Sequence, residues 1–168
     1  MDRGTHEPAE ILVGRVPPKA DPPITIQPDR EVRRATSIEV DPETLENVEG
    51  RLDAHRDTIA AFFGVTLVGR EGVGFLRYGP GGFYRPHRDR ADLPSWPGAA
   101  RRAVAIVIFL NDEFTGGTLR VLDDEPIDVL PRAGSLVAFP ATALHEVVPV
   151  RTGTRDVIVD WFLDTGAA

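Results

Sequence analysis

The 168-residue sequence contains no cysteine, and this absence excludes both disulfide bonds and metal sites built from thiolates. It also lacks an excess of basic residues, because 19 Lys and Arg stand against 26 Asp and Glu and leave a net charge of −7. Such a chain attracts phosphate backbones poorly, so we expect no nucleic-acid partner. The longest apolar runs fall well short of about 18 residues, and we therefore expect no membrane partner either.

The N-terminal region lacks the basic and apolar blocks of a secretory signal, because acidic residues precede the only short apolar run, Ile11–Val13. We therefore expect a cytoplasmic protein. Residues 1–32 are rich in proline and charge, and we interpret them as a lead-in segment, with a short strand over Ile24–Ile26. The remaining residues, 33–168, suffice for one domain with a sizeable core.

The pattern of apolar residues predicts one helix followed by many short strands. Asp41 and Pro42 form a helix start, and apolar residues then recur at helical spacing up to Gly64, which predicts a buttressing helix over residues 42–63. Thr36–Val40 reads as a strand before it. The expected later strands are Val73–Tyr78, Tyr84–Asp89, Ala103–Leu110, Thr118–Leu122, Ile127–Leu130, Ser135–Phe139, His145–Val150 and Asp156–Leu163. This order predicts a mainly β fold with a supporting helix: a double-stranded β-helix, or cupin-like jelly roll.

Three residues form a candidate metal site. His87 and Asp89 lie two apart on a predicted strand and so share one face, and His145 lies at the start of a late strand. Two imidazoles and one carboxylate suit Fe(II) and leave coordination positions open, although Zn(II), Mn(II) and Co(II) accept the same donors. A lone His-x-Asp triplet is more often a surface feature, and a lone histidine more often structural.

Arg155 is a candidate anchor for the far carboxylate of a keto diacid bound to such a metal. A simple hairpin over residues 151–154 would leave it about 16 Å from His145, too far for one ligand to bridge. A connection that crosses between two sheets about 10 Å apart would bring it within reach. Thr154 would add a hydroxyl. The alternatives are that Arg151 is the anchor, or that Arg155 is a surface residue paired with an acid.

Two tyrosines flank the glycine-rich turn before His87. A phenol from Tyr78 or Tyr84 near the metal would hydrogen-bond the keto acid, whereas half-buried packing in the sheet is the commoner role for a strand aromatic. The loop Arg90–Arg101 directly follows the first two ligands, so it either borders the substrate pocket or is an ordinary connection. Basic side chains at Arg85, Arg88 and Arg90 either attract an acidic substrate or form a solvated face.

Several segments in order resemble the prolyl 4-hydroxylase branch of the Fe(II)/2-oxoglutarate-dependent dioxygenases. They are Phe75–Asp89, Phe109–Asn111 with Gly116–Leu119, and His145–Val150 with Gly153–Arg155 and Trp161–Phe162. The resemblance implies a jelly roll around iron, with His87, Asp89 and His145 as ligands. It also implies Arg155 as the anchor for the C5 carboxylate of 2-oxoglutarate and Tyr78 as a residue of that pocket. Phe109 departs from relatives that carry tyrosine there. Asp89 is retained, which argues against the halogenase variant.

The resemblance implies a hydroxylase that acts on an unactivated C–H bond of an amino acid, a prolyl residue or a small metabolite and releases succinate and CO2. Its cofactors would be Fe(II), 2-oxoglutarate and O2, with ascorbate an open addition. Tyr84, Arg85, Trp96 and Trp161 are the candidate substrate residues. The alternatives are a non-catalytic metal- or ligand-binding jelly roll and a zinc hydrolase. The sequence does not specify an oligomeric state.

Overall fold

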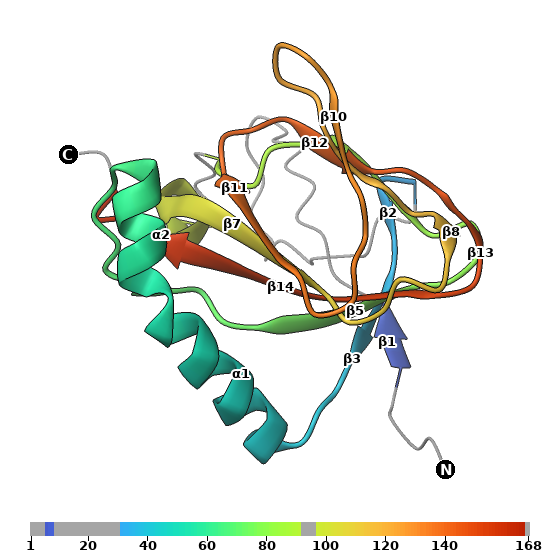
Figure 1. The fold of residues 1–168 in the computed structure, drawn as a ribbon, viewed down its shortest axis with the longest axis horizontal. Helices are drawn as coiled ribbons and strands as arrows, with labels where there is room; N and C mark the ends of the chain where they lie inside the picture. Colours follow the sequence, from blue (N-terminus) through green and yellow to red (C-terminus); the bar gives the residue numbers. More distant parts are fainter. Residues whose placement is uncertain (1–5, 9–30, 92–96, 167–168) are drawn as a thin grey trace, which may run out of the picture.

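Two antiparallel sheets face each other in the computed structural model, which describes residues 6–8, 31–91 and 97–166 (Figure 1). In the larger sheet the order is β1 (His6–Pro8), β3 (Thr36–Ile38), β5 (Gly74–Tyr78), β14 (Arg155–Leu163), β7 (Arg102–Phe109) and β11 (Leu136–Pro140), and β4 (Gly69–Arg70) also pairs with β14. In the smaller sheet the order is β10 (Ile127–Val129), β9 (Leu119–Val121), β12 (His145–Val147), β6 (Phe83–His87) and β2 (Arg33–Arg34). The predicted β sandwich is confirmed.

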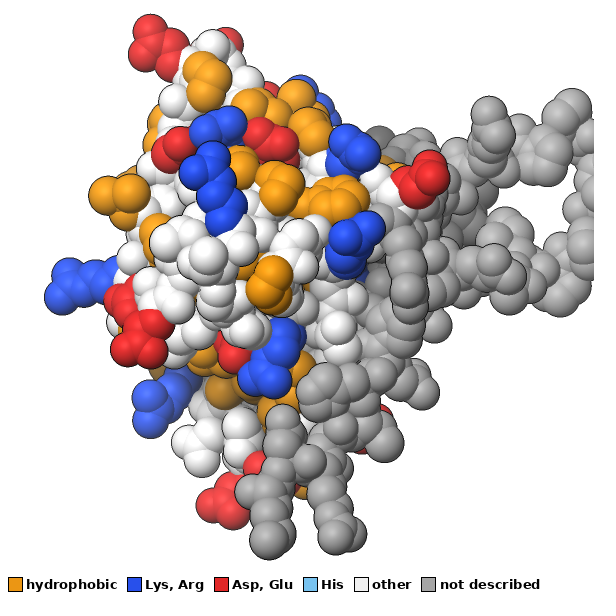
Figure 2. Space-filling view, turned by 90° about the vertical axis from the view of Figure 1, so that its right-hand side faces the viewer, with side chains coloured by type: hydrophobic (Ala, Val, Ile, Leu, Met, Phe, Trp, Pro, Cys, Tyr) orange, Lys and Arg blue, Asp and Glu red, His pale blue; other side chains and the backbone are white. Residues whose placement is uncertain are grey.

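A third, two-stranded pairing closes one end of the sandwich. Strand β8 (Thr115–Gly116) pairs with β13 (Val150–Thr152). The side of the molecule where these strands lie mixes basic and acidic side chains with hydrophobic ones (Figure 2). At the edge of the larger sheet, β1 comes from the segment interpreted as a lead-in and pairs with β3. The strand expected over Ile24–Ile26 falls outside the described residues.

The helices pack on the outer face of the larger sheet. Asp41 caps α1 (Pro42–Ala54) by accepting from the Thr44 N–H at 2.9 Å, and Gly64 ends α2 (Arg56–Phe63) in the left-handed conformation. The single helix predicted over 42–63 is wrong in one respect, because it divides at His55. There φ and ψ are −95° and −4°, and the His55 N–H donates to Leu52 in a tighter turn. Among the described residues no helix is long and apolar enough to cross a membrane.

Strand β14 separates two apolar cores through the alternation of its side chains. Phe162 packs outward with Val104 of β7 and Leu52 of α1, whereas Val157 packs inward with Phe109 between the sheets. The outward face also carries Asp160, which is fully buried. Asp160 is paired with the Arg70 guanidinium and accepts the Gly72 and Trp161 N–H groups at 3.0 and 2.7 Å. The helices therefore support the same strand whose inner face borders the space between the sheets.

Candidate metal centre and its cavity

The candidate metal donors converge from two paired strands of the smaller sheet. His87 ends β6 and lies opposite His145, which begins β12. The Nε2 atoms of His87 and His145 each lie 3.5 Å from a carboxylate oxygen of Asp89. All three donor atoms fall within 4.8 Å of one another, a spacing that one metal ion can bridge. The arrangement leaves one side of the cluster facing the space between the sheets, which the cavity below occupies.

Asp89 reaches this cluster from a loop and not from the strand. The predicted strand Tyr84–Asp89 is wrong at its end, because β6 stops at His87. Beyond that point the N–H groups of Asp89 and Arg90 donate to the carbonyl of Ala141 at 3.0 and 2.8 Å and leave the strand ladder. The connection before β12 thus holds Asp89 in place, and the carboxylate is about nine-tenths buried.

Backbone carbonyls fix the orientation of both imidazoles. The Nδ1 atom of His87 lies 2.7 Å from the Arg85 carbonyl, and that of His145 lies 2.9 Å from the Ala143 carbonyl. Since a carbonyl only accepts, each Nδ1 carries a hydrogen, and each Nε2 lies on the side of Asp89, where it is the ring atom available to a metal. Tyr84 stacks on the His87 ring at 3.5 Å between centroids. Both rings are therefore preset for metal binding through Nε2.

The charge states of the cluster also suit a metal. Burial lowers the pKa of His145, which favours the neutral imidazole that a metal requires. Burial opposes ionisation of Asp89, but the His87 and His145 rings outweigh it and hold the pKa of Asp89 below its ordinary value. Burial raises the pKa of Tyr84 to about 12, so this phenol keeps its proton at neutral pH.

A cavity joins the metal donors to Arg155, and the space between its lining atoms amounts to about 450 Å³ when the open solvent at its mouth is counted. Its walls are mainly apolar side chains of both sheets: Leu76, Ala105, Val107, Leu119, Phe139, Val147 and Val159. Arg155 lines the cavity from β14 in the larger sheet, while β12 with His145 belongs to the smaller sheet. The predicted crossing between the sheets is therefore present, and the hairpin that would have separated these residues is not formed.

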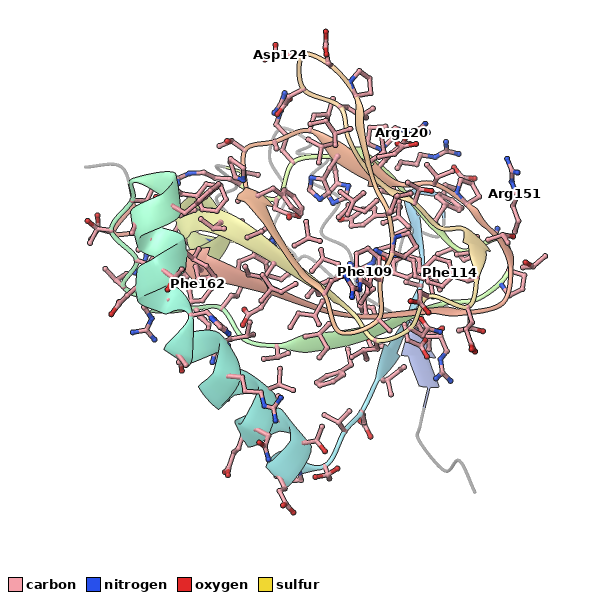
Figure 3. The ribbon with its side chains drawn as sticks, in the orientation of Figure 1. Phe109, Phe114, Arg120, Asp124, Arg151 and Phe162 are labelled. Atoms are coloured by element: carbon pink, nitrogen blue, oxygen red, sulfur yellow. The ribbon has the colours of Figure 1, made fainter. Side chains whose placement is uncertain are left out.

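Arg155 is a buried cation without an anionic partner in the described part of the chain. Its exposed fraction is 1%, and its guanidinium carbon lies 5.0 Å from the Tyr78 ring centre and 5.2 Å from that of Phe109. Burial lowers the pKa of Arg155, which the Tyr78 phenol partly opposes, and its Nε atom has no hydrogen-bond partner. A guanidinium in such a place can bind a carboxylate through charge-assisted hydrogen bonds. By contrast, Arg151 is exposed and points away from the sandwich (Figure 3).

The candidate substrate residues divide into two groups. Tyr84 and Trp161, like Tyr78, line the cavity. Arg85 is exposed and donates to the Glu31 carbonyl at 2.6 Å, and it is not a lining residue. Trp96 falls outside the described residues.

The remaining polar residues near the site are engaged elsewhere. Thr154 does not line the cavity, and its carbonyl accepts a hydrogen bond from Asn111. Arg88 pairs with Asp123 at 3.3 Å, and Arg90 pairs with Asp164 at 2.5 Å. Because both guanidinium groups are already paired with carboxylates, they are less suited to attract an acidic substrate.

Two arginines near the site were not predicted from the sequence. Arg33 of the short strand β2 lines the cavity with its guanidinium 5.2 Å from the Tyr84 ring centre. Arg102 lies 3.8 Å from the Trp161 ring centre, pairs with Glu71 and donates to the Asp89 carbonyl at 3.3 Å. The pairing of strands that are distant in the sequence brings both arginines to the site, so no local sequence pattern indicates their position.

Comparisons with known proteins agree with this geometry. The model of the 2OG-Fe(II) oxygenase superfamily matches residues 73–163. A PKHD-type hydroxylase of Picosynechococcus is 41% identical over 91 residues, which cover 52% of this chain and 39% of that protein. The chain thus spans about two fifths of the length of the curated relatives that it matches.

Solved structures show the same fold. A prolyl-4-hydroxylase of Pseudomonas putida superposes with a TM-score of 0.68 at 31% identity, over 83% of this chain and 77% of that one. A prolyl hydroxylase of Trichoplax adhaerens, solved in complex with a hypoxia inducible factor peptide fragment, has a TM-score of 0.63 at 20% identity, over 79% of this chain and 64% of that one.

Proposed function

Because the chain belongs to the 2OG-Fe(II) oxygenase superfamily, we propose that it is an Fe(II)- and 2-oxoglutarate-dependent hydroxylase whose iron ligands are His87, Asp89 and His145. The observation that carries the proposal is the shared cavity, which has three metal donors at one point of its wall and, at another, the cation of Arg155, which has no anionic partner among the described residues. Iron with bound 2-oxoglutarate and O2 supplies the oxidising power, and the products are succinate, CO2 and the hydroxylated substrate.

The donor set fits Fe(II) well. It has two imidazoles, one carboxylate and no sulfur, and all three come from one side of the cavity, so positions remain open for the oxo acid and O2. The carbonyl partners at Nδ1 prevent the rings from turning, and the buried Asp89 has its lone pairs directed toward both of them. The chain therefore contributes a rigid binding face that needs little rearrangement when the metal enters.

Arg155 binds the C5 carboxylate of 2-oxoglutarate in this proposal. Its charge has no competing anion among the described residues, and the walls around it exclude water, so the ion pair forms in a low-dielectric setting where it is strong. Tyr78 is paired with Arg155 across the strands and lines the same cavity, so its phenol is placed to hydrogen-bond 2-oxoglutarate as well. The hydroxyl expected from Thr154 is not part of this arrangement, because Thr154 does not line the cavity. Ascorbate would serve to return oxidised iron to Fe(II).

The primary substrate enters near Tyr84 and Trp161, which border the metal side of the cavity. We propose an amino acid, a prolyl residue of a peptide or a related small metabolite, since the P. putida and T. adhaerens proteins are prolyl hydroxylases. Arg85 and Trp96 remain candidate contacts for the part of the substrate outside the cavity. The apolar walls hold the reacting C–H bond and exclude water until the substrate binds.

The experiment is a succinate-release screen with Fe(II), 2-oxoglutarate and O2 across amino acids, proline-containing peptides and small metabolites. His87→Ala and Asp89→Ala should abolish both succinate release and the visible charge-transfer band of the anaerobic Fe(II)–2-oxoglutarate complex. His55→Ala, which removes an exposed histidine of the helical region, should keep both signals. A zinc hydrolase would require neither O2 nor 2-oxoglutarate, and a non-catalytic binding protein would give the band without succinate under every condition.

A further inference from the structure

Asn111 holds both peptide groups that flank Arg155. Its side-chain Nδ2 donates to the carbonyl of Thr154 at 2.7 Å, and its Oδ1 accepts from the N–H of Asp156 at 3.0 Å. One amide thus contacts the backbone immediately before and immediately after the arginine. Both bonds join segments more than 40 residues apart in the sequence.

This contact replaces a missing part of the sheet. Strand β7 ends at Phe109, which pairs with Val157 of β14. The last backbone bond beyond it is the Leu110 N–H to the Asp156 carbonyl at 2.9 Å. Past this point no backbone of β7 is in register with Arg155, and the Asn111 amide supplies the donor and the acceptor that a further strand residue would have offered. On its other side Arg155 is already paired with Tyr78 of β5.

The side chain of Arg155 has no comparable polar support. Its Nε lacks a partner, and its guanidinium lies near the Tyr78 and Phe109 rings, with the Tyr78 phenol as a hydrogen-bond partner. Its stem lies against Gly117, where an added Cβ would come 3.1 Å from the Arg155 Cδ. The direction of the guanidinium therefore depends largely on the backbone at residue 155 and on close packing of the stem, because the Tyr78 phenol is the one side-chain hydrogen-bond partner recorded for it among the described residues.

We propose that Asn111 is a positioning residue that sets the direction of Arg155 and thereby the affinity for 2-oxoglutarate. It acts through the backbone and touches neither the metal donors nor the cavity. The inference rests on the proposed function, since it assigns Arg155 to the C5 carboxylate. A residue that merely stabilises the sandwich would affect both ligands, whereas substitution of Asn111 should weaken the binding of 2-oxoglutarate and leave the affinity for the metal unchanged.

The test compares Asn111→Ala with the wild type in two assays. The first is calorimetric titration of 2-oxoglutarate into the Mn(II)-loaded protein without O2, which needs no turnover. We expect the dissociation constant for 2-oxoglutarate to rise about ten- to a hundredfold, because a displaced Arg155 guanidinium loses charge-assisted hydrogen bonds to the ligand. The affinity for Mn(II) should stay within about twofold. The second is steady-state succinate release, in which the KM for 2-oxoglutarate should rise by a similar factor and kcat should change less than about threefold.

Arg77→Ala is the matched control. Arg77 makes two side-chain hydrogen bonds to Asp156, at 2.8 and 2.9 Å, so its removal also costs two bonds at the start of β14. These two bonds go to the carboxylate of Asp156, whereas the bonds of Asn111 go to the peptide groups next to Arg155. We expect a similar loss of thermal stability but a change in 2-oxoglutarate affinity below about twofold. Asn111→Gln keeps an amide donor and acceptor and should recover part of the affinity that Asn111→Ala loses.

Three results distinguish the outcomes. Equal weakening of 2-oxoglutarate binding by Asn111→Ala and Arg77→Ala would overturn the proposal, because the effect would then be general loosening of the strand. Unchanged affinity in Asn111→Ala, with normal Arg155-dependent binding in the wild type, would overturn it as well. Absence of 2-oxoglutarate binding in the wild type would instead refute the proposed function on which the inference rests.

Discussion

Replacing Arg155 with methionine should stabilise the ligand-free protein while it abolishes co-substrate binding. Arg155 is 1% exposed, has no carboxylate partner among the described residues and leaves its Nε without a hydrogen bond. A charge in that position is a cost to the fold that only a bound anion removes. Methionine has a similar length, adapts to irregular spaces and carries no charge.

The size of the effect follows from two opposing contributions. Transfer of a charged group to the interior costs several kcal/mol after relaxation. The Tyr78 and Phe109 rings at 5.0 and 5.2 Å return about 0.5–2 kcal/mol each through cation–π attraction. The remainder predicts that Arg155→Met increases the free energy of unfolding by about 1–3 kcal/mol. For a chain of this length that corresponds to a rise in Tm of roughly 2–4 °C per kcal/mol.

The measurement is urea denaturation of the Mn(II)-loaded protein, without O2, in the presence and absence of 2-oxoglutarate. At a hundred times its dissociation constant, 2-oxoglutarate should stabilise the wild type by about 2.7 kcal/mol and leave Arg155→Met unchanged. Arg77→Met serves as the control, because Arg77 is half-buried and paired with Asp156, so its loss should be neutral or destabilising. A lower free energy of unfolding in ligand-free Arg155→Met would refute the assignment of Arg155 as a buried, uncompensated cation.

Three further substitutions test the surroundings of this residue. Asp160→Ala should lower the free energy of unfolding by about 3–5 kcal/mol in thermal melts, because it leaves the Arg70 guanidinium without its buried partner; a loss below 1 kcal/mol would contradict this. Gly117→Ala should cost about 1–3 kcal/mol and weaken 2-oxoglutarate binding in calorimetry, since φ is +60° and the new Cβ would press on the Arg155 stem; unchanged binding would exclude packing of the stem as a determinant. Phe109→Tyr should lower the KM for 2-oxoglutarate by adding a hydroxyl near Arg155 and should cost the ligand-free protein about 1–3 kcal/mol; an unchanged KM would show that the hydroxyl does not reach the ligand.

Local sequence signals predicted the parts of the fold that depend on neighbouring residues. The Asp41 cap, the stop at Gly64 and the alternation along β14 follow from a few adjacent side chains, and each is observed. The position of Arg155 depends on a more distant relation: a ligand of limited length requires a connection that crosses between the sheets, and the topology confirms that crossing. The assignment of individual residues to iron and 2-oxoglutarate stays a prediction.

Features that depend on distant pairing could not be predicted in the same way. The alternation rule placed Asp89 on a strand, whereas two N–H groups bind Ala141 and turn the chain out of the ladder. Apolar spacing continued through His55, so it gave no sign of the break between α1 and α2. Arg33 borders the cavity only because β2 pairs with β6. For Asp89 and Arg33 the deciding contact comes from a segment that the local pattern does not include.

Strand β14 contributes both to the candidate site and to the stability of the fold, because its two faces contact different parts of the molecule. The smaller sheet carries both candidate histidine ligands, and the larger sheet carries Arg155, so the cavity exists only while the sheets keep their spacing. The inner face of β14 supplies Arg155 and Trp161 to the cavity, and its outer face holds the helices through Phe162 and Asp160. Alternate residues of this one rigid strand point to opposite faces. Weaker packing of the helices should therefore displace Arg155 while the metal ligands, which lie outside β14, keep their positions. Variants of the helix interface such as Leu52→Ala should therefore weaken 2-oxoglutarate binding before they weaken metal binding, and paired titrations of 2-oxoglutarate and Mn(II) would show that order or contradict it.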